Sequence, residues 1–174
     1  RPLLLRSRPS QGGGLHSGKP VPAPPGSRSG LSGLKERMSQ TNHHSTSSTD
    51  APGVTVVCLN YKGKTVLPDC LESLRRQTYP NLHVIVVENA SGDGSAQIVR
   101  ERFPEVELIE NAENLGFGGG NNVGLAAVRT PFAVMLNNDT ELDPECIAEM
   151  VRVMQSDPTV GAVASKILLK FNDL

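Results

Sequence analysis

The sequence predicts an α/β fold built on a mostly parallel sheet with helices on both faces. From Val54 onward, short runs of apolar and β-branched residues alternate with segments whose apolar residues recur at helical spacing. Strands of a covered parallel sheet are buried on both faces, so they read as continuous apolar runs of this kind. Polar residues directly follow three of the predicted strands, which is where such sheets bind ligands.

Each strand and helix is predicted from its own stretch of sequence. The expected strands are the apolar runs at 54–59, 82–87, 106–110, 132–136 and 160–164, with a further run at 167–171 after a break. The expected helices lie at 67–74, at 95–103, at 119–129 and from Pro144 onward. Pro144 suits the first turn of the last helix with Asp143 as its N-cap, and Asp93 or Ser95 is expected to cap the second helix.

Residues 1–53 have a different composition, dominated by Gly, Pro, Ser, Thr and Arg. Such a segment buries too little apolar surface to offset the entropy of ordering, so a disordered tail is expected here. The first methionine is Met38, which we take as the natural start of the protein. A weak tether to anionic membranes is the alternative interpretation of the scattered arginines.

Charge and cysteine content exclude several classes of protein. Residues 51–174 hold ten Lys and Arg against sixteen Asp and Glu, and this acidic balance argues against a nucleic-acid partner. It is compatible with a bound divalent cation. Cys58, Cys70 and Cys146 form neither a disulfide framework nor a zinc pattern, so we expect small buried thiols. No apolar run approaches the roughly 20 residues of a membrane-spanning helix.

Polar residues cluster where the predicted strands end. Asn60 and Tyr61 follow the first strand, Glu88 and Asn89 the second, and residues 137–139 the fourth. The tetrapeptide 137–140 places a carboxylate two residues after an amide, and such oxygen ligands suit Mg²⁺ or Mn²⁺ bound together with a diphosphate. A simple turn is the alternative, since Asn and Asp favour turns. Glu88 ends a buried strand, where an acceptor could read the imide N–H of a pyrimidine base.

A glycine-rich segment at 114–122 precedes the third predicted helix. It has four glycines in five positions beside paired asparagines, which allows close backbone approach to a ligand, while the helix start would favour an anion. It matches neither the dinucleotide fingerprint nor a P-loop. A flexible loop is the alternative interpretation.

Four motifs in order resemble glycosyltransferase family 2, the inverting GT-A group, and most closely its rhamnosyltransferase-like branch. They are the opening strand 56–61, the segment 86–95 that is similar to V-D-N-x-S-x-D-G-S, the segment 114–122 that is similar to N-x-G-F-x-G-G-N-N, and residues 136–140 at the D-x-D position. The resemblance implies the GT-A fold, a Rossmann-like sheet that binds nucleotide-diphospho-sugars. Residues 54–174 would be its nucleotide-sugar-binding part, with the acceptor half absent.

The resemblance also implies residue roles. Asp139 would coordinate the divalent metal (Mg²⁺ or Mn²⁺), with Asn137 in support. The implied donor-binding residues are Asn60, Tyr61, Glu88, Asn89, Gly118, Gly119, Asn121, Asn122 and Asn138. Two positions depart from the family pattern: Glu88 stands where Asp is common, and Asn137 replaces the first Asp of D-x-D.

The implied activity is transfer of a sugar, with inversion, from dTDP-rhamnose or a UDP-sugar to a hydroxyl of a glycan or lipid-linked acceptor in cell-envelope polysaccharide synthesis. The implied location is the cytoplasm, with peripheral association at the inner face of the cell membrane. The catalytic general base is expected beyond Leu174, since Asp157 reads as a capping residue and Asp173 is terminal. Two alternatives stay open: a nucleotide-sugar-binding fragment without transfer, and a nucleotidyltransferase. The latter needs a glycine-rich basic loop that residues 60–64 match poorly.

Overall fold

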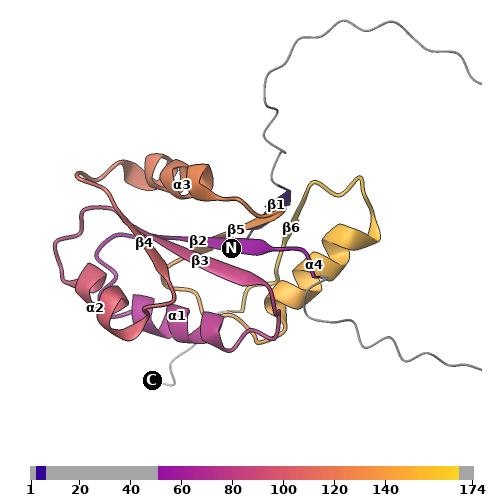
Figure 1. Cartoon of the computed structure of the whole chain (residues 1–174), viewed down its shortest axis with the longest axis horizontal. Helices are drawn as coiled ribbons and strands as arrows, with labels where there is room; N and C mark the ends of the chain where they lie inside the picture. Colours follow the sequence, from indigo (N-terminus) through magenta and orange to yellow (C-terminus); the bar gives the residue numbers. More distant parts are fainter. Residues whose placement is uncertain (1–2, 7–50, 169–174) are drawn as a thin grey trace, which may run out of the picture.

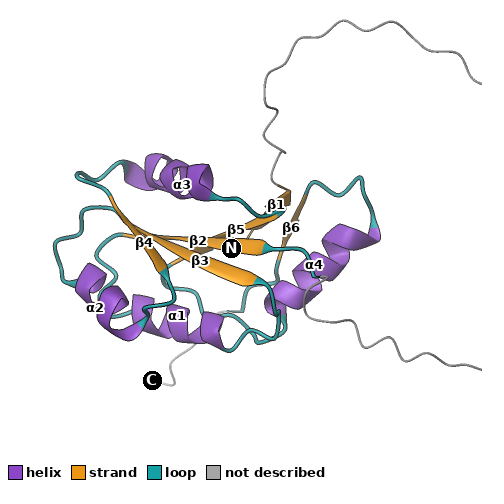
Figure 2. Cartoon of the chain, viewed as in Figure 1, coloured by secondary structure: helices purple, strands orange, loops and turns teal. Residues whose placement is uncertain are grey.

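The protein is a six-stranded sheet with helices packed on both faces (Figures 1 and 2). The computed structural model describes residues 3–6 and 51–168 of the 174-residue chain. The strand order is β4-β3-β2-β5-β1-β6. The strands are β1 (Leu3–Arg6), β2 (Val54–Asn60), β3 (Leu82–Glu88), β4 (Glu107–Glu110), β5 (Phe132–Asn137) and β6 (Ala162–Ala164). The helices are α1 (Leu67–Arg75), α2 (Ser95–Arg102), α3 (Gly116–Ala127) and α4 (Cys146–Ser156).

Four neighbouring strands, β4, β3, β2 and β5, run parallel, as the sequence predicts. Val54 at the start of β2 pairs with Leu82 on one side and Phe132 on the other. Because the strands begin in register, their carboxyl ends also coincide, and Asn60 lies opposite Glu88. The three predicted polar strand ends therefore meet at one edge of the sheet.

Helices cover both faces of the sheet, which confirms the predicted layers (Figure 1). The larger core packs α1, α2 and α4 against one face through fully buried side chains such as Leu67, Phe103 and Ile147. Burying one such side chain contributes about 1.5–3 kcal/mol. The smaller core packs α3 against the other face around Val57, Ile85 and Val87. Among the described residues, no helix is long and apolar enough to cross a membrane.

Helix α3 lies unusually close to the sheet because its inner face is glycine. A Cβ atom at Gly120 would lie 2.4 Å from Cδ1 of Leu59, and one at Gly124 would lie 2.3 Å from Cγ1 of Val57. Both glycines therefore allow the helix backbone to touch the side chains of β2. The sequence predicts close backbone approach to a ligand in the segment 114–122, and at Gly120 the structure shows close approach to the sheet.

The N-terminal segment departs from the expectation of disorder at its first residues. Leu3–Arg6 forms β1, which pairs antiparallel with β5 and with β6. An edge strand presents unpaired N–H and C=O groups, and β1 satisfies those along β5. Of the rest of the predicted tail, residues 51–53 are described and lead into β2, and residues 1–2 and 7–50, including Met38, fall outside the described residues.

Helix boundaries differ from the sequence expectation at two places. α3 begins at Gly116, three residues earlier than predicted. Gly116 has a φ of 69°, a left-handed backbone angle that glycine adopts readily. α4 begins at Cys146 and not at Pro144. Asp143 acts one turn earlier, where its carboxylate accepts a hydrogen bond from the backbone N–H of Glu145 at 3.0 Å. β6 is shorter than the expected fifth strand, and the run at 167–171 lies mostly outside the described residues.

Candidate functional site

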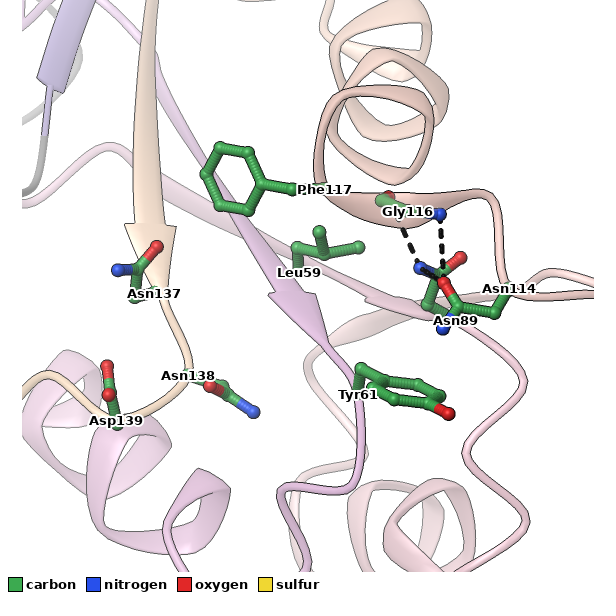
Figure 3. Close-up of a pocket in the computed structure, with 9 residues that line it drawn as sticks. All are labelled: Leu59, Tyr61, Asn89, Asn114, Gly116, Phe117, Asn137, Asn138 and Asp139. Atoms are coloured by element: carbon green, nitrogen blue, oxygen red, sulfur yellow. Dashed lines mark hydrogen bonds between the residues drawn. The ribbon is translucent and has the colours of Figure 1, made fainter.

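A cavity of about 310 Å³ opens beyond the carboxyl ends of the parallel strands (Figure 3). Its lining residues are Leu59, Tyr61, Asn89, Asn114, Gly116, Phe117, Asn137, Asn138 and Asp139. Figure 3 places Asn137, Asn138 and Asp139, here called the β5 wall, on the side opposite Asn89, Asn114 and Gly116, here called the α3 wall. Parallel sheets bind ligands at this edge, so the cavity is the candidate site.

A buried chain of hydrogen bonds runs behind the β5 wall. Asn60 is 0% exposed, and its Nδ2 donates to Oε2 of Glu88 at 2.5 Å and to Oγ of Ser95 at 2.9 Å. Its Oδ1 accepts a hydrogen bond from Nδ2 of Asn138 at 2.7 Å. The other carboxylate oxygen of Glu88, Oε1, accepts from the backbone N–H of Ser91 at 2.8 Å. These hydrogen bonds join the end of β2, the loop that follows β3 and the loop that follows β5.

Gly63 makes room for this chain. A Cβ atom at that position would lie 2.1 Å from Oδ1 of Asn60 and 2.2 Å from Nδ2 of Asn138. Contacts that short are impossible, so any side chain at position 63 would force the Asn60–Asn138 hydrogen bond apart. In the sequence, Gly63 is only a lone glycine between two lysines, and nothing there marks it as part of the site.

The α3 wall is organised by Asn89, which is 2% exposed. Its Nδ2 donates to Oδ1 of Asn114 at 2.6 Å and to the carbonyl oxygen of Gly116 at 3.3 Å. Its Oδ1 accepts from Nδ2 of Asn111 and from the backbone N–H of Leu115, both at 3.0 Å. All the hydrogen-bonding capacity of this amide is therefore spent on holding residues 111–116.

Asp139 is the carboxylate of the β5 wall. Its side chain is exposed and, among the described residues, has no hydrogen-bond or ion-pair partner. Asn137 is also exposed, and its side-chain amide likewise has no hydrogen bond within the described part of the chain. No group of three or more His, Cys, Asp or Glu in that part could hold a metal. One free carboxylate beside one free amide therefore fits a cation that a phosphate ligand also coordinates.

The cysteines near this wall are buried thiols, as expected. Cys70 donates through Sγ to the carbonyl oxygen of Asn137 at 3.7 Å. A hydrogen bond with Cys70, together with full burial and the charge of Asp139, raises the pKa of the Cys58 thiol well above its ordinary value. Cys58 is therefore a neutral thiol, as expected for a cysteine buried in the core.

Two exposed aromatic rings border the cavity. Phe117, 65% exposed, extends from the first turn of α3, and Tyr61, 44% exposed, follows β2 (Figure 3). Exposed aromatic side chains at a cavity mouth offer stacking faces for planar or ring-shaped ligands. Leu59 adds apolar surface between them.

The cavity brings together only part of the predicted site. Five predicted residues line it: Tyr61, Asn89, Asn137, Asn138 and Asp139. Six do not: Asn60, Glu88, Gly118, Gly119, Asn121 and Asn122. Glu88 is 5% exposed, and both of its oxygens accept hydrogen bonds from protein groups. Asn121 turns inward and donates to the carbonyl oxygen of Phe117 at 2.9 Å.

Four lining residues are absent from the predicted set, namely Leu59, Asn114, Gly116 and Phe117. Three of them belong to the start of the segment 114–122, whereas the predicted donor-binding residues lie in its later part. The start of the helix could have identified them, because the first residues of a helix lie nearest the strand ends, while the later ones continue along the sheet.

Fold and cavity together define an α/β domain with a candidate ligand site beyond the carboxyl ends of its parallel strands. Residues 54–169 match the family model described as glycosyl transferase family 2. The chain belongs to this family.

Relatives and solved structures agree with that assignment. The putative glycosyltransferase EpsH of Bacillus subtilis is 31% identical over 105 residues, covering 59% of this chain and 30% of that protein. The teichoic acid poly(glycerol phosphate) polymerase of Staphylococcus epidermidis is 28% identical over 93 residues, covering 51% and 13%. The mannosyltransferase PcManGT from Pyrobaculum calidifontis, solved with GDP-Man and Mn²⁺, superimposes with a TM-score of 0.59 at 30% identity, covering 65% and 35%. The chain spans about a third or less of each of these proteins.

Proposed function

We propose that the cavity binds a nucleoside-diphosphate sugar together with a divalent cation, as the donor side of a glycosyltransferase. One observation carries the proposal: the carboxylate of Asp139, which has no partner among residues 3–6 and 51–168, lines the same cavity as the exposed rings of Tyr61 and Phe117. A nucleoside-diphosphate sugar needs both features, a cation site for its diphosphate and apolar faces for its rings.

The metal would be held by Asp139, with the amide oxygen of Asn137 as a second ligand. Mg²⁺ and Mn²⁺ bind through one or two protein carboxylates when substrate phosphates supply further oxygens. When bound, the cation neutralises the charge that develops on the departing diphosphate. Asp139 alone would repel a diphosphate, so this wall is suited to a phosphate ligand only in the presence of a cation.

The nucleoside would lie toward the α3 wall. Asn114 uses Oδ1 to accept from Asn89 and from the backbone N–H of Gly116, so its Nδ2 donor remains for a ligand. Stacking of a base on an aromatic side chain contributes about 1–3 kcal/mol, which Tyr61 or Phe117 would supply. Asn89 and Glu88 support the site from behind, and neither is assigned a ligand contact.

The reaction proposed for the enzyme is transfer of the sugar, with inversion, to a hydroxyl of a glycan or lipid-linked acceptor. The mannosyltransferase solved with GDP-Man and Mn²⁺ supports a metal-dependent sugar nucleotide. The teichoic acid polymerase among the relatives supports a cell-envelope polymer as the product. UDP-sugars, GDP-mannose and dTDP-rhamnose are the donors to be tested. We place the domain in the cytoplasm, where sugar nucleotides are made, with peripheral contact to the membrane.

Calorimetry tests the proposal directly. The chain is titrated with UDP-, GDP- and dTDP-sugars, with and without Mn²⁺, alongside Asp139→Ala and the equally charged, exposed control Glu113→Ala. We expect Mn²⁺ to raise the affinity for at least one donor in the wild type and in Glu113→Ala. In Asp139→Ala, the Mn²⁺-dependent affinity should fall by about 100-fold.

Transfer is then assayed with the donor that binds best. Release of the nucleoside diphosphate in the presence of a hydroxyl acceptor supports the full reaction, whereas binding without release restricts the proposal to donor binding. Equal affinity in Asp139→Ala and the wild type, with and without Mn²⁺, would remove the metal site from the proposal.

A further inference from the structure

In the buried chain behind the β5 wall, each hydrogen bond has a fixed donor and a fixed acceptor, and this order extends to Asn138 at the cavity. We infer that Ser95, Glu88 and Asn60 are positioning residues that fix the orientation of the Asn138 amide, so that its oxygen faces the cavity beside Asp139. Gly63 is the residue whose missing side chain permits this arrangement. The inference rests on the proposed function and deepens it, because it assigns a further oxygen to the metal side of the donor site.

The order starts at Glu88, whose two oxygens both meet donors. Oε1 accepts from the backbone N–H of Ser91 at 2.8 Å, and Oε2 accepts from Asn60. The single hydroxyl proton of Ser95 is shared between Oε2 of Glu88 at 2.8 Å and Oδ1 of Asp93 at 2.6 Å. An ionised carboxylate is acceptor-only, so it can serve both positions at once. A neutral amide at this position would turn an NH₂ group against one of those donors.

Asn60 extends that order to the β5 wall. Its Nδ2 group is directed to Glu88 and Ser95, so only its oxygen is left to face Asn138. Asn138 must then present its own Nδ2 to Asn60, as the 2.7 Å hydrogen bond requires. Amide orientations are assigned from the network of partners, and here each partner allows one choice. Figure 3 shows the nitrogen of Asn138 directed away from Asp139.

The Asn138–Asn60 hydrogen bond also connects the side chains of the β5 wall to the rest of the protein. Among the described residues, the side chains of Asn137 and Asp139 make no hydrogen bond to the rest of the protein. The backbone is held by a turn from the N–H of Thr140 to the carbonyl of Asn137 at 3.3 Å and by the long contact from Cys70. Releasing Asn138 would therefore free both the orientation of its amide and the placement of Asp139.

Gly63→Ala is the sharpest test, because the new methyl group disrupts the Asn60–Asn138 pair while every cavity-lining residue keeps its identity. Gly161→Ala is the matched control, since a Cβ atom there meets nothing within 4 Å. We expect Gly63→Ala to lower the factor by which Mn²⁺ strengthens binding of UDP or GDP by about tenfold, as is common for residues behind metal ligands. Metal-free nucleotide affinity should stay unchanged.

Glu88→Gln is the second variant, and it separates positioning from base recognition. A positioning role predicts the same loss of Mn²⁺ enhancement as in Gly63→Ala, with metal-free affinity retained. If Glu88 instead read the base, Glu88→Gln would weaken nucleotide binding equally with and without Mn²⁺, and Gly63→Ala would not match it. That result would overturn the inference.

Hydrogen exchange in the ligand-free protein gives a readout that does not depend on the proposed function. Gly63→Ala and Glu88→Gln should speed exchange of the amides at 137–140, while the amides at 111–116 keep their wild-type rates. Unchanged exchange at 137–140 in both variants would overturn the inference even if the donor site stands. Absence of any Mn²⁺-dependent nucleotide binding in the wild type would instead overturn the proposed function.

Discussion

The two walls of the cavity are built very differently. The α3 wall is held by Asn89 through hydrogen bonds to Asn111, Asn114, Leu115 and Gly116. Within the described residues, the side chains of the β5 wall make one hydrogen bond to the rest of the protein, from Asn138 to Asn60, and the backbone of the wall receives a long contact from Cys70. The α3 wall is thus held by an amide whose donors and acceptors are all used. The β5 wall carries the carboxylate of Asp139, which has no partner among the described residues, on a loop with few hydrogen bonds.

This difference matches what each wall would bind. A nucleoside has a fixed shape, and a rigid wall pre-organises its site so that less entropy is lost on binding. A cation bound with a diphosphate needs ligands that adjust to the distances that the metal sets. We therefore expect the α3 wall to determine protein stability and nucleotide affinity, and the β5 wall to determine metal dependence.

Asn89→Ala should produce the largest effect among the changes that probe this contrast. The substitution removes an amide that is 2% exposed, and it leaves Nδ2 of the partly buried Asn111 and the backbone N–H of the exposed Leu115 without their partner. We expect a loss of about 1–3 kcal/mol in the free energy of unfolding, because water can satisfy part of what the lost hydrogen bonds satisfied. Urea denaturation measures the loss, and metal-free nucleotide affinity should fall with it.

Asn122→Ala is the matched control for stability, because Asn122 is exposed on α3 and its side chain has no hydrogen bond within the described part of the chain. Its free energy of unfolding should stay within about 0.5 kcal/mol of the wild type. Equal stability of Asn89→Ala and Asn122→Ala would show that the α3 wall does not depend on Asn89, and the contrast between the walls would be lost.

Phe117→Ala sharpens the comparison in a different way, because it should separate affinity from stability. The side chain is 65% exposed, so its removal should change the free energy of unfolding by less than about 0.5 kcal/mol. If the ring stacks on the nucleotide, affinity should fall about tenfold whether or not Mn²⁺ is present. Calorimetry with UDP and GDP measures this, and Phe117→Tyr should restore the affinity. A loss confined to the Mn²⁺-containing titration would place Phe117 with the metal side instead.

The sequence predicts the frame of the site well because the frame depends on strands. Continuous apolar runs place β2, β3 and β5 within one residue of their observed ends, and parallel register then brings Asn60, Glu88 and Asn137 to one edge. The same runs cannot tell which side chain at a strand end faces the cavity. A strand buried on both faces has no alternation of polar and apolar residues, so its sequence does not show which side chains point to which face of the sheet. Asn60 and Glu88 were therefore assigned to the ligand, although they face the protein.

Glycines show a second limit of sequence reasoning. Gly118, Gly119 and Gly120 look alike in the sequence, yet a Cβ atom would meet nothing within 4 Å at Gly118 and would clash with Leu59 at Gly120. Gly63 matters for the site only because Asn60 and Asn138, 78 residues apart, meet beside it. Such meanings depend on tertiary contacts that no local pattern records. β1 shows the same limit, since its formation depends on the free edge of β5.

Asp93 offers the smallest expected effect and probes the outer end of the chain behind the β5 wall. Partial burial opposes its ionisation, but hydrogen bonds from the hydroxyl and backbone N–H of Ser95 and from the backbone N–H of Lys64 outweigh this and lower the pKa of Asp93. A lowered folded-state pKa stabilises the fold above the unfolded value near pH 4, and this contribution is lost as the pH falls further. Asp93→Asn should therefore cost at most about 0.5 kcal/mol at pH 7, because solvent screens a partly exposed carboxylate.

The difference between Asp93→Asn and the wild type should shrink between about pH 5 and pH 3, as Asp93 in the wild type becomes protonated. Urea denaturation across that range measures it, with Glu101→Gln as a control that removes an equal charge from α2. A difference that stays constant with pH would mean that the charge of Asp93 contributes nothing to the free energy of unfolding. Because Ser95 links Asp93 to Asn60, the same titration followed by hydrogen exchange at 137–140 would report whether protonation of Asp93 also loosens the β5 wall.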